Sequence, residues 1–265
     1  MDQEQSFSSL MEKLFPFSYV KWCIHPSETD FNDSVPFRGI LTQDFLHLIM
    51  KAIWVRSNVL FSNEMFKFLD EFCDLVSSSS PDTYIVHVVC LCQIVADITK
   101  DIHDRFISIL SLVTSISALV SRKYFDLYQL TPNILEVFYN AALKKEFYKQ
   151  DGWNGLKRFL QNTEYAIWYK KLRSITSAVE NERFSKEFLE CTQLKILILE
   201  NNPLDVIEEK LFDETVLDIT RRVISTVKPS LWENLNAFAS KEKATSNSYE
   251  SESESECSSF EEFEV

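Results

Sequence analysis

Histidine and cysteine side chains, the residues that could hold a metal ion, occur close together at two places in the chain. Cys23 and His25 form one pair, and the stretch "HVVCLC" contains His87, Cys90 and Cys92. Tetrahedral zinc sites need four such ligands, and on a helix Cys92 lies about 200° around the axis from Cys90. One helix therefore cannot offer all three residues to one ion. We expect buried, reduced thiols at 90 and 92, no cofactor, and at Cys23 and His25 only a weak metal candidate that another chain would complete.

Residues 144–173 combine positive charge with aromatic side chains. They hold eight Lys and Arg against three Asp and Glu, in a chain whose net charge is −13. Such a segment could bind an acidic peptide or single-stranded nucleic acid, or it could be a solvated helix face whose aromatic residues belong to the core. We prefer the last interpretation. Its candidate partner-binding residues are Lys170, Lys171 and Arg173.

Catalytic motifs are missing from the sequence. No glycine-rich phosphate loop, H-E-x-x-H or G-x-S-x-G pattern occurs, so we expect no enzymatic activity. The chain has 3 glycines in 265 residues, whereas ordinary usage of about 7% would give roughly 18. Tight hairpins and phosphate-binding loops need glycine, so both hairpin-rich β structure and nucleotide-binding α/β folds are disfavoured.

The segment from 15 to 40 is rich in aromatic residues and contains three prolines. We predict an irregular arm that wraps the helical body or becomes ordered on a partner. Its candidate partner-binding residues are Phe15, Phe17, Tyr19, Trp22, Phe31 and Phe37.

The C-terminal stretch "SNSYESESESECSSFEEFEV" is strongly acidic. Residues 241–265 contribute −6 to the net charge and contain few large apolar side chains, so we predict a disordered tail. Four of its serines have glutamate three residues later, which resembles the context of casein-kinase-2-like phosphorylation: Ser251, Ser253, Ser258 and Ser259. The tail could solubilise the protein, which we prefer, dock on a partner, or cover residues 144–173.

Helix start signals recur along the whole chain. In each case a capping residue comes before a run in which apolar residues recur every three or four positions. The predicted caps are Thr42, Ser62, Ser80, Asp101 or nearby His103, Thr131, Asn154, Thr163, Ser185, Asn202, Asp213 and Ser230. The most apolar stretches, 84–96 and 106–120, are shorter than the roughly 18 to 20 residues that span a bilayer, and they predict buried core helices.

The pattern as a whole predicts an all-α fold of roughly ten to twelve helices, arranged as a bundle or as a short paired-helix array. We divide the chain into an N-terminal helix with its arm at 1–40, a helical interaction domain at 41–240, and the tail at 241–265.

For function, we expect a non-enzymatic scaffold or bridging subunit of an intracellular complex. We favour a nuclear location, and a chromatin- or telomere-associated assembly is a setting that would suit such a subunit. It would bind short segments of partner proteins between its helices and could form homodimers. We expect neither a membrane partner nor direct binding of nucleic acid. The alternatives are a helical nucleic-acid-binding module that uses residues 144–173, and a helical enzyme without recognisable motifs.

Overall fold

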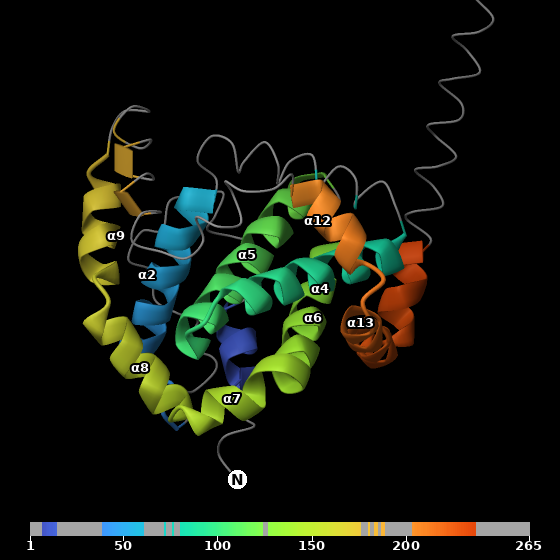
Figure 1. Ribbon diagram of the computed structural model, residues 1–265, viewed down its shortest axis with the longest axis horizontal. Coiled ribbons are helices and arrows are strands. Elements are labelled where there is room, and N and C mark those ends of the chain that lie inside the picture. The colour runs from blue at the N-terminus through green and yellow to red at the C-terminus, as the bar shows by residue number, and fades with distance from the viewer. Residues whose placement is uncertain are drawn as a thin grey trace, which may run out of the picture.

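The computed structural model describes residues 7–14, 39–60, 80–123, 127–175 and 203–236, with single positions at 72, 76, 180, 183, 184, 187 and 188. These residues form helices joined by short turns, and no strand occurs among them (Figure 1). The predicted all-α fold is confirmed. The α-helices are α2 (Gln43–Leu60), α4 (Pro81–Ile98), α5 (Ile102–Lys123), α6 (Thr131–Phe138), α7 (Lys144–Lys149), α8 (Gly152–Asn162), α9 (Tyr165–Arg173), α12 (Pro203–Lys210) and α13 (Glu214–Thr226). Residues 7–14 and 229–236 are also helical.

Several predicted helix starts are confirmed by their hydrogen bonds. The Ser80 hydroxyl accepts from the Thr83 backbone N–H at 3.4 Å, and Pro81 follows it in the first turn of α4. Asp101 accepts from the N–H groups of residues 103 and 104 before α5, both at 2.9 Å. Asp213 accepts from the N–H of Thr215 at 2.8 Å before α13. Each side chain satisfies a donor that the helix itself leaves unpaired.

Four predicted caps are wrong, and one of them, Ser230, lies inside the helix at 229–236. Thr131 lies inside a continuous helical path, because the 3₁₀ turn η1 (Leu127–Leu130) leads directly into α6, and its buried hydroxyl pairs with that of Ser117 at 2.9 Å. Asn154 is already within α8. Thr163 follows the end of α8, where its hydroxyl donates to the Phe159 carbonyl at 2.7 Å. In each case the local pattern marked a helix, but tertiary packing moved its boundary.

The turn between α7 and α8 requires an unusual backbone. Asp151 has φ +68° and Gly152 has φ +51°, both in the left-handed region. Glycine adopts this conformation without the steric cost that a Cβ atom imposes. Two such residues in succession reverse the chain sharply, so that α8 packs against α7 and α2.

Helix α5 forms the centre of the protein and packs against α2 and α4 (Figure 1). Its buried hydroxyls are satisfied within the helix itself: those of Ser108, Ser111, Thr114 and Ser115 donate to the carbonyl four residues earlier at 2.6–2.7 Å. A helix with many serines can therefore lie in an apolar core without unpaired donors.

By length and composition alone, α4 and α5 could each cross a membrane. In this structure, however, 61% of the apolar window of α4 and 89% of that of α5 is buried inside the protein. Both helices thus form the core of the fold, as the sequence predicted.

Aromatic side chains fill the lower part of the core. The path from α6 to α7 includes a π-helical turn, η2 (Tyr139–Leu143), which turns Tyr139 inward. The Tyr139 ring stacks on Phe7 with centroids 4.2 Å apart, and Phe106 and Phe147 each pack edge to face against Tyr139. Trp153 in turn packs edge to face against both phenylalanines. These rings join the helix at 7–14 to α5, α7 and α8.

Candidate protein interaction surface

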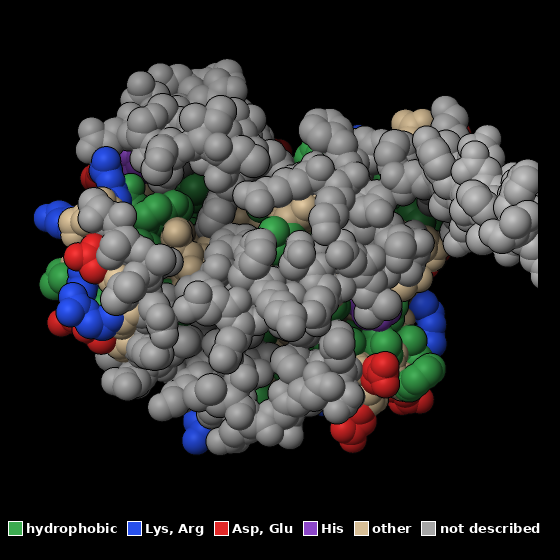
Figure 2. Space-filling model, turned by 90° about the horizontal axis from the view of Figure 1, so that it is seen from above, with side chains coloured by type: hydrophobic (Ala, Val, Ile, Leu, Met, Phe, Trp, Pro, Cys, Tyr) green, Lys and Arg blue, Asp and Glu red, His purple; other side chains and the backbone are tan. Residues whose placement is uncertain are grey.

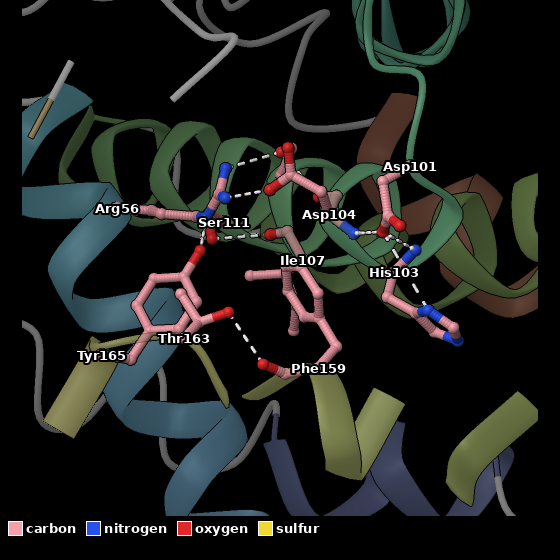
Figure 3. Close-up of polar contacts among 10 residues, drawn as sticks. Arg56, Asp101, His103, Asp104, Ile107, Ser111, Phe159, Thr163 and Tyr165 are labelled. Atoms are coloured by element: carbon pink, nitrogen blue, oxygen red, sulfur yellow. Dashed lines mark hydrogen bonds and ion pairs between the residues drawn. The ribbon is translucent and has the colours of Figure 1, made fainter. Parts of the chain in front are cut away.

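A buried arginine joins three helices that are far apart in the sequence. The side chain of Arg56, on α2, is 2% exposed. Its Nε donates to the hydroxyl of Tyr165 on α9 at 2.6 Å, and its Nη1 donates to Ser108 on α5 at 2.7 Å. Its Nη2 forms an ion pair with Asp104, also on α5 (Figure 3). Every branch of the guanidinium group therefore has a partner.

The charge of Arg56 is kept in the interior by these partners. Burial lowers the pKa of Arg56, but the negative charge of Asp104 and the hydrogen bonds to Tyr165 and Asp104 offset this effect and leave its pKa raised. Burial likewise raises the pKa of the Tyr165 phenol, which therefore stays protonated. A buried charge is tolerated only where it is paired and fully hydrogen-bonded. The network consequently fixes where α9 lies on α2.

Further along α9, aromatic rings continue the contact with α2. Tyr169 packs edge to face against Trp54 of α2, with centroids 5.0 Å apart. Trp168 packs in the same way against Phe184 and Phe188, at 5.4 and 5.7 Å. The rings of Trp168 and Tyr169 are both half-buried. They pack against the protein on the inner side of α9, and the outer face of the helix remains in solvent.

Cations from both helices surround these rings. Lys51 of α2 and Arg173 of α9 both lie over Tyr169, at 5.7 and 5.9 Å from its centroid. Lys171 lies 5.3 Å from the centroid of Trp168 and forms an ion pair with Glu187, whose pKa is lowered chiefly by the hydrogen bond from this lysine. In the described part of the chain, Lys51, Lys170 and Arg173 have no carboxylate partner. The edge formed by the two helices therefore carries uncompensated positive charge.

The outer face of α9 also exposes an apolar side chain. Ile167 is 61% exposed, and Lys170 and Lys171 follow it at three and four residues. Residues at these spacings are neighbours on a helix surface. We call the combined region the α2–α9 surface, and it consists of Lys51, Trp54, Ile167, Trp168, Tyr169, Lys170, Lys171 and Arg173. At the corresponding end of the protein, Figure 2 shows Lys and Arg side chains with Asp and Glu side chains beside them.

The rest of the basic segment does not join this surface. Residues 144–173 run through α7, α8 and α9 along the lower and left edges of the molecule (Figure 1). Phe147, Trp153 and Tyr165 are buried, so these aromatic residues belong to the core, as the preferred interpretation held. On α8, Arg158 pairs with Asp151 at 2.6 Å. The α8 portion meets α2 through the buried pair of Phe45 and Trp153, whereas the α9 portion meets both a cation and an aromatic ring of α2 at its exposed edge.

The cysteines of the "HVVCLC" stretch are buried. Burial raises the pKa of the Cys90 thiol to about 12 and also raises that of Cys92, and the Cys90 thiol points to the Ile207 carbonyl at 3.6 Å. The His87 Nδ1 lies 2.7 Å from the carbonyl of Thr83 in the preceding turn. No group of three potential metal ligands occurs among the described residues.

The remaining predicted site residues lie outside the described part of the chain. They are the arm residues Phe15, Phe17, Tyr19, Trp22, Phe31 and Phe37, the metal candidates Cys23 and His25, and the phosphorylation candidates Ser251, Ser253, Ser258 and Ser259. The predicted caps Ser62, Ser185 and Asn202 also lie there, so these predictions stand as made.

Sequence reasoning missed the α2 half of the surface. Lys51, Trp54 and Arg56 stand in an apolar helix, where Lys51 and Trp54 are three residues apart. The sequence did contain one signal, the arginine at position 56 on the apolar stripe of α2. A buried arginine requires partners, so this residue indicated a polar contact to another helix. Nothing local could have indicated that the partner would be residue 165.

Comparisons of the chain with protein-family models, with curated proteins and with solved structures found no match.

Proposed function

We propose that this protein is a non-enzymatic interaction protein, a bridging or scaffold subunit of a multiprotein complex, which binds acidic segments of its partners on the α2–α9 surface. The observation that carries the proposal is the meeting of Lys51, Lys170 and Arg173, without carboxylate partners in the described structure, beside half-buried aromatic rings and the exposed Ile167. Acidic side chains would pair with the cations, and an apolar residue would cover Ile167. The intracellular setting, with preference for the nucleus, stays a prediction.

The arrangement of the rings favours a peptide over single-stranded nucleic acid. Proteins that bind single strands stack bases on exposed aromatic faces. Here Lys51 and Arg173 lie over Tyr169, and Lys171 lies over Trp168. These cations compete for the ring faces that a base would need. The net charge of −7 outside residues 241–265 also opposes a polyanion as long as a nucleic acid.

Rigidity of the surface supports a binding role. Arg56 and Trp54 hold α9 against α2 from beneath. A preformed surface loses little conformational entropy on binding, so more of the interaction energy appears as affinity. The flanking cations would add mainly to the rate of association and to specificity for acidic segments.

The proposal can be tested with a defined acidic probe. A synthetic peptide of residues 246–265 contains seven glutamates and three aromatic residues. Its binding would be measured by fluorescence anisotropy, both to the full chain and to a variant that ends at residue 240. The shorter variant keeps every described residue and cannot present its own tail as a competitor.

We expect the double variant K170E/R173E to weaken binding of the probe by about tenfold or more, because each lost surface pair is worth up to about 1 kcal/mol. The matched control is R221E/K228E, which reverses two exposed cations on and after α13. It should change the affinity less than threefold. Equal effects of the two double variants would contradict a specific surface, as would probe binding that neither variant alters. Tighter and more steeply salt-dependent binding of a single-stranded oligonucleotide would replace the proposal with the nucleic-acid alternative.

A further inference from the structure

A second strongly exposed hydrophobic side chain lies at the other end of the molecule from α9. Phe212, in the turn between α12 and α13, is 83% exposed. Ile167 and Phe212 are the large hydrophobic side chains that the described structure leaves exposed. Figure 1 places α9 at the left edge and α12 and α13 at the right. A single exposed hydrophobic residue is common on protein surfaces, so Phe212 becomes informative only together with the charges that surround it.

The turn that carries Phe212 is held rigidly. The Leu211 N–H donates to the Ile207 carbonyl at 2.9 Å, and the Asp213 N–H donates to the Lys210 carbonyl at 3.0 Å. The Lys210 ammonium is tied to Asp97 of α4 at 2.8 Å, a bond that is the largest cause of its raised pKa. Phe212 is thus presented by a fixed backbone, as the aromatic anchors of protein interfaces are.

The charge around Phe212 is opposite to that of the α2–α9 surface. Glu208, Glu209 and Glu214 are exposed, and none of them has a cationic partner in the described part of the chain. The nearby Asp213 carboxylate accepts the Thr215 N–H at the N-terminus of α13, and the Lys210 ammonium is paired with Asp97. Figure 2 shows hydrophobic and acidic side chains together at this end of the molecule, with Lys and Arg side chains next to them. We call Phe212 with these three glutamates the α12–α13 knob.

We propose that the α12–α13 knob of one copy docks on the α2–α9 surface of a second copy, head to tail. The two regions match in kind: Phe212 would cover Ile167, and the three glutamates would face Lys51, Lys170 and Arg173. In the described part of the chain, neither region is covered by groups of the kind that the other supplies. The inference rests on the proposed function, since it names a second copy as one source of the acidic segment.

The geometry determines the kind of assembly. Because the two regions lie at different ends of the molecule, the contact joins different surfaces of the two copies and is therefore heterologous. Each copy can bind one neighbour through its knob and another through its α2–α9 surface. The product is therefore a ring or an open chain of copies rather than a symmetric dimer. A single turn on a helix edge buries a small area, so the association should be weak and concentration-dependent. It should also weaken with salt, because exposed charges are screened.

Sedimentation velocity of the full chain tests the proposal. We expect the weight-average sedimentation coefficient to rise with concentration up to about 100 µM in about 0.05 M salt, and the rise to disappear in about 0.5 M salt. The knob variant F212S/E209K and the surface variant K170E/R173E should each stay monomeric alone. These substitutions change exposed side chains, so folding, checked by circular dichroism, should be unaffected.

Mixing the two variants gives the decisive measurement. The K170E/R173E chain keeps an intact knob, and the F212S/E209K chain keeps an intact surface, so the mixture should form a one-to-one dimer and nothing larger. The control R221E/K228E should associate like the unaltered chain. A symmetric interface would instead leave both variants associated or leave the mixture monomeric, and either result would overturn the inference. If the unaltered protein binds the acidic probe but stays monomeric at every concentration, only the self-association is overturned. If the unaltered protein does not bind the probe, the proposed function itself is overturned.

Discussion

The guanidinium Nε of Arg56 donates to the hydroxyl oxygen of Tyr165 at 2.6 Å, although the two residues are 109 positions apart in the chain. This hydrogen bond joins the middle of α2 to the first residue of α9. Since the remaining guanidinium donors bind Ser108 and Asp104 of α5, one side chain sets the relative positions of three helices. The α2–α9 surface exists only because these positions are fixed.

Loss of either side of this network should destabilise the protein. R56M removes the buried cation and leaves Asp104 unpaired, and we expect the free energy of unfolding to fall by about 3–5 kcal/mol. Y165F removes only one acceptor and should cost about 1–3 kcal/mol. Urea denaturation would measure both. The matched control is R158M, which breaks an exposed pair with Asp151 and should cost less than about 1 kcal/mol. An R56M chain as stable as R158M would show that the network does not hold α9 in place.

Gly155 should not tolerate even alanine. A Cβ atom at this position would lie 2.3 Å from the Gln150 carbonyl oxygen and 2.7 Å from the His103 ring. We expect G155A to lower the free energy of unfolding by about 1–3 kcal/mol or more, although alanine is normally the better helix residue. Asn154 is exposed in the same helix, so N154A provides the control and should be neutral or slightly stabilising in the same thermal and urea experiments. Equal stability of the two variants would show that the close approach is absent in solution.

Protonation of His103 should destabilise the fold. Its ring packs on Phe147 and Phe159, and burial, the largest cause, lowers its pKa below the ordinary value of 6.5 despite the opposing effect of Asp101. The unfolded chain therefore binds a proton at a higher pH than the folded chain does. The stability that His103 contributes is present above about pH 6.5 and is lost as the pH falls from there toward the folded pKa, with a slope of at most about 1.4 kcal/mol per pH unit.

The variant H103N isolates this contribution. Its free energy of unfolding, measured at pH 7.5 and 5.5, should depend less on pH than that of the unaltered chain. The two chains should consequently differ more at pH 7.5 than at pH 5.5. A difference that grows as the pH falls would mean that the folded protein prefers the charged form of His103, contrary to the structure.

Cys90 and Cys92 should be chemically inert in the folded protein. The thiolate is the reactive form, and burial raises the pKa of both thiols, that of Cys90 to about 12. At pH 8 we expect iodoacetamide to leave both residues unmodified, as read by mass spectrometry of the digested protein. The same treatment in guanidinium chloride should modify both and serves as the positive control. Rapid modification of the native chain at either position would contradict their burial against Ile207 and the core.

Local sequence features sufficed for the fold class and for part of the site. The scarcity of glycine, the apolar periodicity and the caps at Ser80 and Asp213 act within a few residues, so they can be recognised in the sequence alone. The same local reasoning placed Lys170 and Arg173 on an exposed helix face. It failed at Thr131 and Asn154, where neighbouring turns extend a helix beyond the residue that resembles a cap.

Only the tertiary structure decided what those helices form together. The burial of Arg56, the approach of Lys51 to Tyr169 and the need for glycine at 155 each depend on contacts between helices distant in the chain. A periodic pattern shows which face of a helix is apolar but carries no information about which other helix will cover it. Which helices pair depends on the packing of the whole core. Side chains must fit together without voids and buried charges must find partners, and both requirements are met between helices and not within any single helix.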